Sequence, residues 1–362
     1  MNIGLDVRLT AYRTGGISTY SRGLVRALET MLSPDELTLL NSRKAKTPLS
    51  QHFAERTLWT PPHHRLERWA LSLEIARFGL EVLHSPDFIP PRFGAKKRVI
   101  TVHDLTFIHY PDTLTTDSRR YYNDQIETAV READHILVVS EATKRDLITT
   151  LNVPSEKMTV GANGVGKQYK PLDKLQVEQG LKALDLPLQY ILHVGTWEPR
   201  KNLINLAQAY KHLRDTLKDA PPLLLVGKRG WHYEQLRADI DAISAPIIWH
   251  DDITDDQLPL IYNGALCNVT VSFYEGFGLP ALEGMACGIV PIVSNRSSLP
   301  EVVGNVGLQI VPEDPDSIAA ALQQAITDTD WRNNQRPLAL AQASKYTWEN
   351  CARAALQAYQ SA

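Results

Sequence analysis

Short apolar runs alternate with amphipathic stretches along most of the chain. The runs are rich in Val, Ile and Leu, whereas the stretches between them repeat apolar side chains every three or four positions, as one face of a helix does. Continuous apolar strands separated by helices are typical of parallel sheets that are covered on both faces. The expected strands are 2–7, 82–84, 98–102, 135–139, 158–160, 190–194, 223–226, 247–249, 268–271, 289–293 and 308–311.

The alternation of strands and helices breaks once, where glycines, prolines and many charges gather in 163–187. A chain of 362 residues is also long for one core and suits two domains. We therefore expect two doubly wound, Rossmann-like α/β domains that face a cleft, because open parallel sheets bind ligands beyond the carboxyl ends of their strands. The expected organisation is an N-terminal domain over 1–170, a linker over 171–187, a C-terminal domain over 188–345, and a helix over 346–362 that can cross back to the N-terminal domain.

Composition narrows the class of protein further. The chain carries 38 basic and 41 acidic side chains, so no global positive field marks a nucleic-acid binder. Its longest uncharged stretch, 257–274, is interrupted by Pro, Asn and Gly and does not predict a transmembrane helix. The first residues lack the pattern of a secretory signal, and the three cysteines form no CxxC pair. These features predict a soluble protein of the reducing cytoplasm.

One segment carries a strong local charge. Residues 43–100 hold 11 basic and 5 acidic side chains, and Trp59 and Trp69 lie among the arginines. One interpretation is a solvated basic face, and the other is docking on anionic lipid at the inner face of the cell membrane or on an anionic acceptor. In the second interpretation the arginines that face the membrane are Arg65, Arg68 and Arg77.

Two turns between a strand and a helix have features of anion-binding sites. In the first, Gly15 and Gly16 would let a ligand approach the backbone at a helix start, although two glycines also make a plain turn. In the second, Arg200 and Lys201 follow Gly195 at a helix start, where basic residues oppose the helix dipole. An anionic ligand would resolve this conflict, since Arg offers a planar fork and Lys a compact charge. The second turn therefore predicts phosphate binding.

Two further segments contain side chains suited to a sugar. Glu275 lies on a loop and Glu283 about one turn inside the helix that Pro280 would begin, and carboxylates accept hydrogen bonds from paired hydroxyls. His103 and Asp104 close a strand at its carboxyl end, which favours a functional histidine over a structural one. The hydroxyls of Ser140, Ser297 and Ser298 lie at further helix starts, where they either cap the helix or contact phosphate, and capping is the default interpretation.

These segments occur in one order, together with Asn163-Gly164-Val165 and Leu225-Val226-Gly227. Glu-Gly-Phe-Gly-Leu-Pro with a second Glu eight positions after the first, and Gly-Thr-x-Glu-Pro-Arg-Lys-Asn, form a highly specific combination. From residue 2 to about residue 348 the chain resembles glycosyltransferase family 4, the retaining nucleotide-sugar glycosyltransferases of the GT-B fold. It is most similar to the bacterial mannosyltransferase-like branch that builds surface polysaccharides.

The resemblance implies that the N-terminal domain over 1–170 binds the acceptor and that the C-terminal domain over 188–345 binds the nucleotide-sugar donor. It also implies roles for the residues above. Arg200 and Lys201 would hold the donor diphosphate, and Glu283 would hold the ribose hydroxyls. Glu275 would contact the hydroxyls of the donor sugar, and His103 would lie near the transferred sugar. His103, Arg200, Lys201 and Glu275 form the implied catalytic set. The other implied donor-binding positions are Gly15 and Gly16, which would also approach the acceptor, Gly195, and the backbone N–H groups of Phe277, Gly278 and Leu279.

The implied activity is transfer of a sugar, with retention of configuration, to a hydroxyl of a glycan or lipid-linked acceptor. The expected donor is GDP-mannose and the expected transferred sugar is mannose. We expect no metal ion or other cofactor, because the cations would stabilise the leaving diphosphate. No carboxylate nucleophile is evident, which favours a front-face mechanism. Gly166, Val271 and the segment 250–253 depart from the family pattern, and the last leaves the donor base open. The alternatives are a UDP- or dTDP-sugar transferase, a GT-B nucleotide-sugar epimerase or hydrolase, and a non-catalytic nucleotide-sugar-binding regulator.

Overall fold

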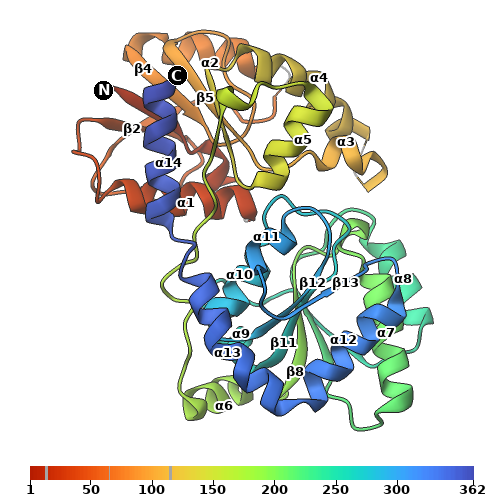
Figure 1. Ribbon diagram of the computed structural model, residues 1–362. Helices are drawn as coiled ribbons and strands as arrows, with labels where there is room; N and C mark the ends of the chain where they lie inside the picture. Colours follow the sequence, from red (N-terminus) through yellow and green to blue (C-terminus); the bar gives the residue numbers. More distant parts are fainter. Residues whose placement is uncertain (13–14, 65, 114–115) are drawn as a thin grey trace. The chain divides into compact units, whose positions relative to one another are not determined.

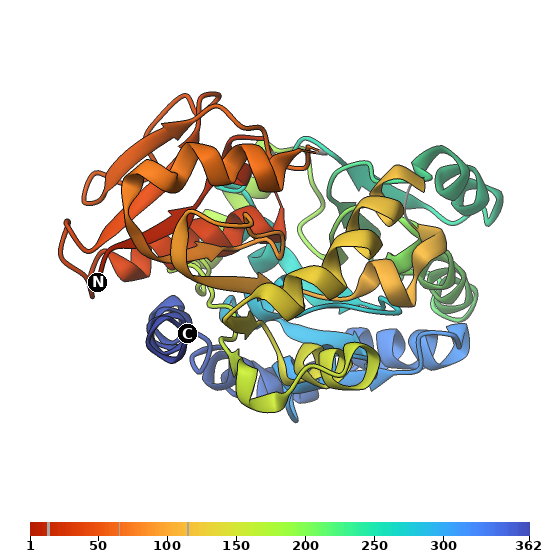
Figure 2. The same ribbon diagram turned by 90° about the horizontal axis from the view of Figure 1, so that it is seen from above.

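The computed structural model of the protein describes residues 1–12, 15–64, 66–113 and 116–362. Contacts divide the chain into two compact units. Unit 1 consists of 1–108, 116–164 and 346–362, and unit 2 consists of 109–113 and 165–345. Both chain ends therefore belong to unit 1 (Figure 2).

Unit 1 is built on a seven-stranded parallel sheet in the order β3-β2-β1-β4-β5-β6-β7. Each apolar run expected in this part of the chain overlaps one of these strands. Strands β2 and β3 lie outside the expected runs, and β3, at the sheet edge, is mostly exposed and therefore lacks an apolar run. The strands are β1 (Ile3–Asp6), β2 (Leu37–Ser42), β3 (Ala54–Leu58), β4 (Leu80–Ser85), β5 (Ala95–Val102), β6 (His135–Val138) and β7 (Met158–Val160).

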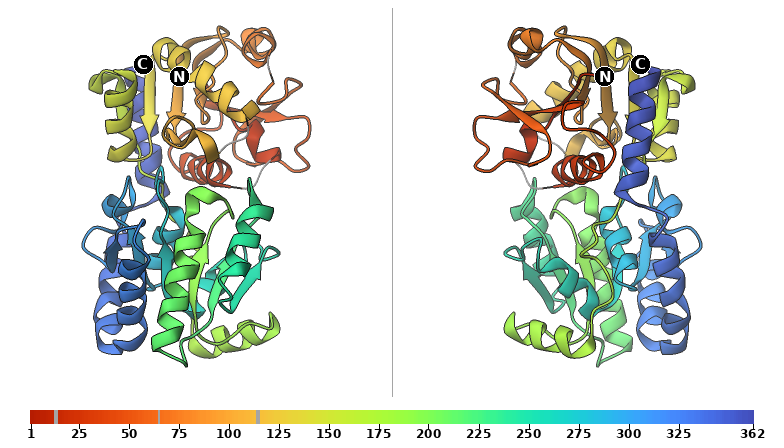
Figure 3. Two further views of the ribbon diagram at one scale, coloured as in Figure 1. Left: turned by 90° about the vertical axis from the view of Figure 1, so that its right-hand side faces the viewer. Right: turned by 90° about the vertical axis from the view of Figure 1, so that its left-hand side faces the viewer.

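The last helix of the chain completes the core of unit 1. Helix α14 (Trp348–Ser361) lies beside α1 (Gly16–Leu28), and both bury apolar side chains against the sheet (Figures 1 and 3). Gly23 permits this approach, because a Cβ there would lie 2.3 Å from the ring of Trp348. The other elements of unit 1 are α2 (Glu67–Ile75), α3 (Thr106–His109), α4 (Thr116–Glu132), α5 (Glu141–Leu151) and the short helices η1 (Arg8–Ala11), η2 (Ala76–Phe78) and η4 (Ser155–Lys157).

Unit 2 is built on a six-stranded parallel sheet in the order β10-β9-β8-β11-β12-β13. Every apolar run expected in the second half of the chain overlaps one of its strands. Two parallel sheets with helices packed on them confirm the expected pair of Rossmann-like domains. The strands are β8 (Tyr190–Val194), β9 (Leu223–Val226), β10 (Ile247–His250), β11 (Ala265–Thr270), β12 (Val290–Ser294) and β13 (Leu308–Ile310).

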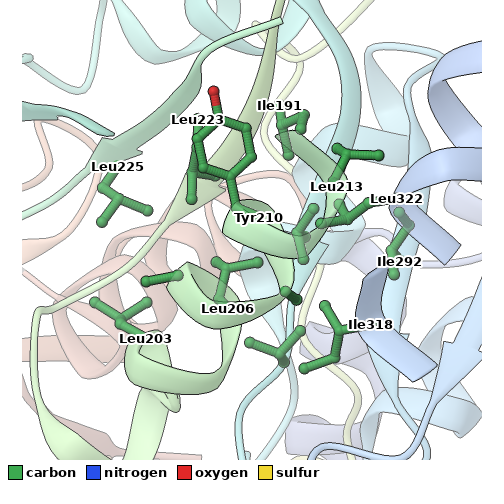
Figure 4. Close-up of a cluster of buried hydrophobic side chains, with 14 of the residues drawn as sticks. Ile191, Leu203, Leu206, Tyr210, Leu213, Leu223, Leu225, Ile292, Ile318 and Leu322 are labelled. Carbon is green, nitrogen blue, oxygen red and sulfur yellow. The ribbon is translucent and has the colours of Figure 1, made fainter. Parts of the chain in front are cut away.

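The main core of unit 2 lies between its sheet and the helices α7 (Leu203–Thr216) and α12 (Pro315–Thr327). Leu206, Tyr210 and Leu213 repeat at helical spacing on the buried face of α7 and pack with Leu223 and Leu322 (Figure 4). The remaining helices are α6 (Lys174–Ala183), α8 (Tyr233–Ala242), α9 (Leu258–Gly264), α10 (Leu279–Ala286), α11 (Leu299–Val303), α13 (Thr329–Ala343) and the short η3 (Pro111–Thr113) and η5 (Pro199–Lys201).

Helix α6 occupies most of 171–187, the stretch expected to be a linker. It packs on α9, and its Val177 and Leu181 are buried in a cluster with Ile261. Gly180 lets Leu260 of α9 come close, since a Cβ at this glycine would lie 2.6 Å from that side chain. The stretch therefore forms part of the core of unit 2.

The order of strands reverses at one place in each sheet. In unit 1, β2 and β3 lie on one side of β1 and β4 to β7 on the other, so the reversal falls between β1 and β4. In unit 2 it falls between β8 and β11. Open parallel sheets bind ligands at such switch points, beyond the carboxyl ends of the two strands. No helix in the described parts of the chain is long and apolar enough to span a membrane.

Candidate active site

The switch point of unit 2 brings together the basic turn and the first glutamate that the sequence predicts. The turn after β8 carries Arg200 and Lys201 on η5, and the loop after β11 carries Glu275. Lys201 Nζ donates a hydrogen bond of 2.6 Å to Glu275 Oε1, and Arg200 Nη1 lies 3.2 Å from Glu275 Oε2. We name these three side chains the ion-pair cluster. Lys201 and Glu275 are buried and Arg200 is partly buried, and the cluster forms although 74 positions separate Lys201 from Glu275.

The ion-pair cluster is held from several sides. Arg200 also binds the carboxylate of Glu198 at 2.7 Å, and Ser272 Oγ donates to Glu275 Oε1 at 2.6 Å. Burial alone would raise the pKa of Glu275, but the positive charges of Lys201 and Arg200 outweigh it and lower the pKa to about 2. Glu275 is therefore ionised at neutral pH. Lys201 has three N–H donors, and Glu275 takes only one of them.

His193 of β8 and Gly195 of the turn after it lie beside Lys201. A Cβ at Gly195 would lie 3.7 Å from Lys201 Cε and 3.3 Å from His193 Nε2, so the glycine leaves the backbone accessible there. His193 is fully buried, and its Nδ1 donates to the carbonyl of Val269 at 2.8 Å. Burial lowers the pKa of His193 to about 4, which keeps the ring neutral. The sequence analysis missed this histidine, because inside an apolar strand it resembles an ordinary core residue.

The loop after Glu275 leads directly into α10. Gly278 precedes the helix with a φ of 103°, a conformation that favours glycine, and Phe277 is buried in the same loop. Leu279 is the first residue of α10, so the helix start follows the ion-pair cluster closely in the chain. Ser297 and Ser298, which were expected to cap a helix, instead donate to the carbonyl of Glu275 at 2.7 and 2.8 Å. They fix the backbone that carries the glutamate.

Glu283 lies one turn inside α10 and has different partners from Glu275. Tyr262 donates to Glu283 Oε2 at 2.8 Å, and the hydroxyl of Tyr169 binds the same carboxylate. Burial raises the pKa of Glu283 to about 7, although the two tyrosines oppose the shift. The two glutamates that the sequence groups together are therefore in distinct states, since Glu275 is bound to cations and Glu283 to phenols.

The raised pKa of Glu283 predicts a pH-dependent stability. Because the folded-state pKa of about 7 exceeds the ordinary value of 4.5, the folded protein binds more protons between these values. Protonated Glu283 therefore stabilises the fold. Its contribution to the free energy of unfolding is complete below pH 4.5 and is lost as the pH rises through 7, and the total loss is about 3 kcal/mol. We expect Glu283→Gln to remove this part of the pH dependence in denaturant unfolding at pH 5 and pH 8. The exposed Glu234→Gln is the control, and identical pH dependence in wild type and Glu283→Gln would contradict the assignment.

The remaining predicted site residues lie in unit 1. His103 follows β5, its Nε2 donates to the carbonyl of Pro86 at 2.9 Å, and its ring packs edge-on against Tyr20 at 5.0 Å. Burial lowers its pKa. Gly15 precedes α1 with a φ of 146°, and a Cβ at Gly15 or Gly16 would meet open space. This conformation explains the glycine at position 15 and leaves the start of α1 accessible.

The expected membrane-facing arginines are not equivalent. Arg68 is buried, forms an ion pair with Glu132 and donates to the carbonyl of Pro90 at 3.0 Å, so its expected place on a membrane surface is wrong. These contacts of Arg68 fix α2 to the neighbouring parts of unit 1. Arg77 is exposed, and its guanidinium lies 5.2 Å from the centroid of the Phe78 ring. Arg65 lies outside the described residues.

Family models and a curated relative match nearly all of this chain. A model of glycosyl transferases group 1 matches residues 182–340, and a model of glycosyltransferase family 4 matches residues 14–168. The O-antigen chain mannosyltransferase B of Escherichia coli is 32% identical over 372 residues, which cover 96% of each chain. This chain belongs to glycosyltransferase family 4. The first match covers unit 2 residues from α6 to α13, and the second covers most of unit 1.

Solved structures agree with this glycosyltransferase in fold. A sucrose-phosphate synthase from Thermosynechococcus elongatus superposes with a TM-score of 0.79 at 19% identity, covering 99% of this chain and 98% of that one. Anabaena Alr3699/HepE in complex with UDP-glucose superposes with a TM-score of 0.78 at 15% identity over the whole of both chains. The glycosyltransferase therefore has the GT-B fold. Its described residues contain no group of three or more His, Cys, Asp or Glu side chains that could hold a metal ion.

Proposed function

We propose that this glycosyltransferase transfers mannose from GDP-mannose, with retention of configuration, to a hydroxyl of a glycan or lipid-linked acceptor in the synthesis of a surface polysaccharide. The observation that carries the proposal is the ion-pair cluster of Arg200, Lys201 and Glu275 at the switch point of unit 2. The mannosyl donor and the polysaccharide product follow from the relative, an O-antigen chain mannosyltransferase.

The ion-pair cluster suits the departure of a diphosphate. Negative charge builds up on the leaving diphosphate in the transition state, and a buried ammonium beside it stabilises that charge more than water would. Lys201 keeps two N–H donors for this purpose, and Arg200 adds a second positive charge. These cations supply the electrostatic stabilisation that a metal ion supplies elsewhere, so we expect full activity in the presence of EDTA.

Glu275 does not fit the role of nucleophile or general acid. Its oxygens accept hydrogen bonds from Lys201, Arg200 and Ser272, and its low pKa keeps it ionised. An ionised carboxylate has no proton to give, and three donors reduce its nucleophilicity. Its remaining lone pairs suit the hydroxyls of the donor sugar. Retention then follows from a front-face reaction in which the departing diphosphate takes the proton of the acceptor hydroxyl.

Donor choice and reaction type can be tested together. We expect GDP-mannose to raise the melting temperature more than UDP-glucose or dTDP-glucose, and GDP release to increase when a mannose-terminated acceptor is added. GDP release that an acceptor leaves unchanged would indicate a hydrolase or epimerase. Stabilisation without any release would indicate a regulator, and stabilisation by UDP-glucose alone would replace the proposed donor.

A surface of unit 1 supports peripheral attachment to an anionic membrane. Three apolar side chains repeat at helical spacing on α2: Leu66, which directly precedes the helix, Trp69 and Leu73. They are 52–71% exposed. Trp59, which is 68% exposed, is joined to α2 by a hydrogen bond of 2.6 Å that its backbone N–H donates to Glu74 Oε1. The guanidinium groups beside these tryptophans are those of Arg43, 5.0 Å from the ring of Trp59, and Arg92, 4.6 Å from the ring of Trp69.

This aromatic–basic surface, made of Trp59, Leu66, Trp69, Leu73, Arg43 and Arg92, combines two features of membrane docking. Tryptophan rings favour the headgroup level, and each arginine near an anionic surface contributes about 1 kcal/mol. The surface differs from the one expected from the sequence, because Arg68 is buried. A lipid-linked acceptor would make such attachment useful.

Vesicle co-sedimentation tests the aromatic–basic surface. We expect wild type to sediment with vesicles of anionic phospholipid at low salt and to be released at high salt, since Coulomb attraction is screened. Arg43→Gln/Arg92→Gln should weaken binding by roughly 30-fold, and Trp69→Ser/Leu73→Ser should weaken it at both salt concentrations. The control Leu175→Ser/Leu338→Ser changes two equally exposed leucines of unit 2. Equal sedimentation of all four proteins would contradict membrane attachment through this surface.

A further inference from the structure

The buried histidine of β8 has one ring nitrogen that is paired and one that is not. His193 is fully buried, and its Nδ1 lies 2.8 Å from the carbonyl oxygen of Val269. A carbonyl oxygen only accepts hydrogen bonds, so Nδ1 carries the proton and Nε2 has a free lone pair. In the part of the chain that the structure describes, Nε2 has no hydrogen-bond partner. Buried polar atoms nearly always have one, so a donor for Nε2 is expected.

The unpartnered nitrogen lies beside the ion-pair cluster. A Cβ built on Gly195 would lie 3.3 Å from His193 Nε2 and 3.7 Å from Lys201 Cε. Both atoms therefore border the same small space beside the backbone of Gly195. The glycine keeps this space open, because a side chain at position 195 would fill it. His193 Nε2 is thus next to the lysine that we assign to the leaving diphosphate.

The charges around His193 indicate which group can donate to it. Among the described residues, the charges that act on its ring are those of Lys201 and Glu275. The ionised carboxylate of Glu275 only accepts hydrogen bonds, so it cannot satisfy a second acceptor. The ammonium of Lys201 has three N–H groups and donates one of them to Glu275 Oε1. Lys201 is therefore the charged neighbour that can donate to Nε2.

A hydrogen bond to His193 would give the ammonium a fixed direction. Lys201 Nζ is one bond from Cε, so rotation about the Cδ–Cε bond moves it around the space that Nε2 borders. The ammonium group carries its three N–H bonds in a tetrahedral arrangement on a flexible stem. If Glu275 and His193 each accept one of them, the direction of the third is set before the glycosidic bond breaks. A preorganised donor of this kind stabilises a developing negative charge better than a mobile one.

We propose that His193 is a positioning residue for Lys201, and that its Nε2 accepts a hydrogen bond from the ammonium when the donor is bound. The remaining N–H of Lys201 is then directed to the leaving diphosphate. The assignment rests on the transferase function proposed above, which places the diphosphate beside Lys201. Burial lowers the pKa of His193 to about 4, so Nε2 stays free of a proton at neutral pH and can accept.

Two amide substitutions separate the roles of the two ring nitrogens. The amide of His193→Asn lies near the place of Nδ1, so this variant can still donate to Val269 but has no atom at Nε2. The longer His193→Gln has its amide near the place of Nε2 and supplies an acceptor there. With GDP-mannose and a mannose-terminated acceptor, we expect His193→Asn to lower kcat about tenfold, and His193→Gln to stay within about threefold of wild type. The donor KM should change less than kcat, because Lys201 acts on charge that develops in the transition state.

The effect of the histidine should depend on Lys201. In the Lys201→Ala background, His193→Asn should change kcat by less than about twofold, since no ammonium is left to direct. The matched control is His212→Asn, which changes an exposed histidine of α7 in the same unit and should leave kcat unchanged. A normal kcat of His193→Asn, a kcat lower in His193→Gln than in His193→Asn, or an equal loss in both backgrounds would overturn the assignment. The last two results would give His193 a purely structural role through Val269.

NMR of wild type tests the same hydrogen bond without turnover. In protein with isotope-labelled histidine, the Nε2 signal of His193 is identified by its absence from His193→Gln. We expect GDP or UDP to move this signal toward that of a hydrogen-bonded nitrogen, and we expect no such movement in Lys201→Ala. An unmoved signal with both nucleotides, or the same movement in Lys201→Ala, would overturn the assignment. If GDP-mannose yields no transfer while the signal moves as expected, only the proposed function is rejected.

Discussion

Replacement of Lys201 by alanine is expected to lower kcat by about 10²–10³-fold, as the loss of one preorganised donor to a developing anion does. Lys201 is buried and binds Glu275 at 2.6 Å, so its charge acts where water does not screen it. The effect should appear mainly in kcat, because the charge on the diphosphate grows as the glycosidic bond breaks. Turnover of saturating GDP-mannose with a mannose-terminated acceptor is the measurement.

The control for this variant is Lys211→Ala, which removes an exposed ammonium from α7 of the same unit. Arg200 and Ser272 still bind Glu275 when Lys201 is absent, so the loop after β11 should remain folded. Thermal unfolding checks this point. A folded Lys201→Ala protein with turnover near that of wild type would remove Lys201 from the mechanism.

Glu275→Gln is expected to lower kcat by about 10²-fold with little change in donor affinity, whereas Glu283→Gln should weaken donor binding about tenfold with little change in kcat. The geometry of the transferred sugar changes in the reaction, so a contact to its hydroxyls differs between ground and transition states. A contact to the ribose, which is remote from the reacting carbon, is similar in both states. The two carboxylates also have different partners, which agrees with two different roles. The cations Lys201 and Arg200 bind Glu275, whereas Tyr262 and Tyr169 bind Glu283.

Single-turnover kinetics and equilibrium binding of GDP-mannose separate these two effects. Tyr262→Phe is a useful companion variant, because it removes one hydrogen bond from Glu283 without touching the ion-pair cluster. It should weaken donor binding less than Glu283→Gln does. The reverse partition, with Glu283→Gln acting on kcat and Glu275→Gln on affinity, would show that the two roles are exchanged.

The sequence predicts the fold well because most strands are continuous apolar runs. Two strands of the first sheet, β2 and the edge strand β3, lie outside the predicted runs, and β3 has the sequence Ala-Glu-Arg-Thr-Leu and exposes most of its side chains. An edge strand needs no apolar run, so the pattern has no signal there. In the same way, the glycines, prolines and charges of 163–187 predict a linker over 171–187, although Val177 and Leu181 of α6 are buried.

The sequence also predicts the charged residues of the unit 2 site, because they lie in short motifs between a strand and a helix. It cannot predict their partners, which come from distant positions. Glu283 binds Tyr262 and Tyr169, and neither tyrosine lies in a motif. In unit 1 the sequence likewise gives no sign of the ion pair between Arg8 and Glu67, which lie 59 positions apart in the chain and meet at 2.7 Å.

The central claim is retaining transfer of mannose from GDP-mannose, and product analysis by NMR tests it most directly. GDP-α-mannose and methyl α-mannoside are incubated with the enzyme in the presence of EDTA, and the anomeric configuration of the new linkage is determined. The account predicts a disaccharide with a new α-mannosidic bond and an equal amount of GDP. A β-linked product, or no disaccharide from GDP-mannose while another nucleotide sugar yields one, would contradict it.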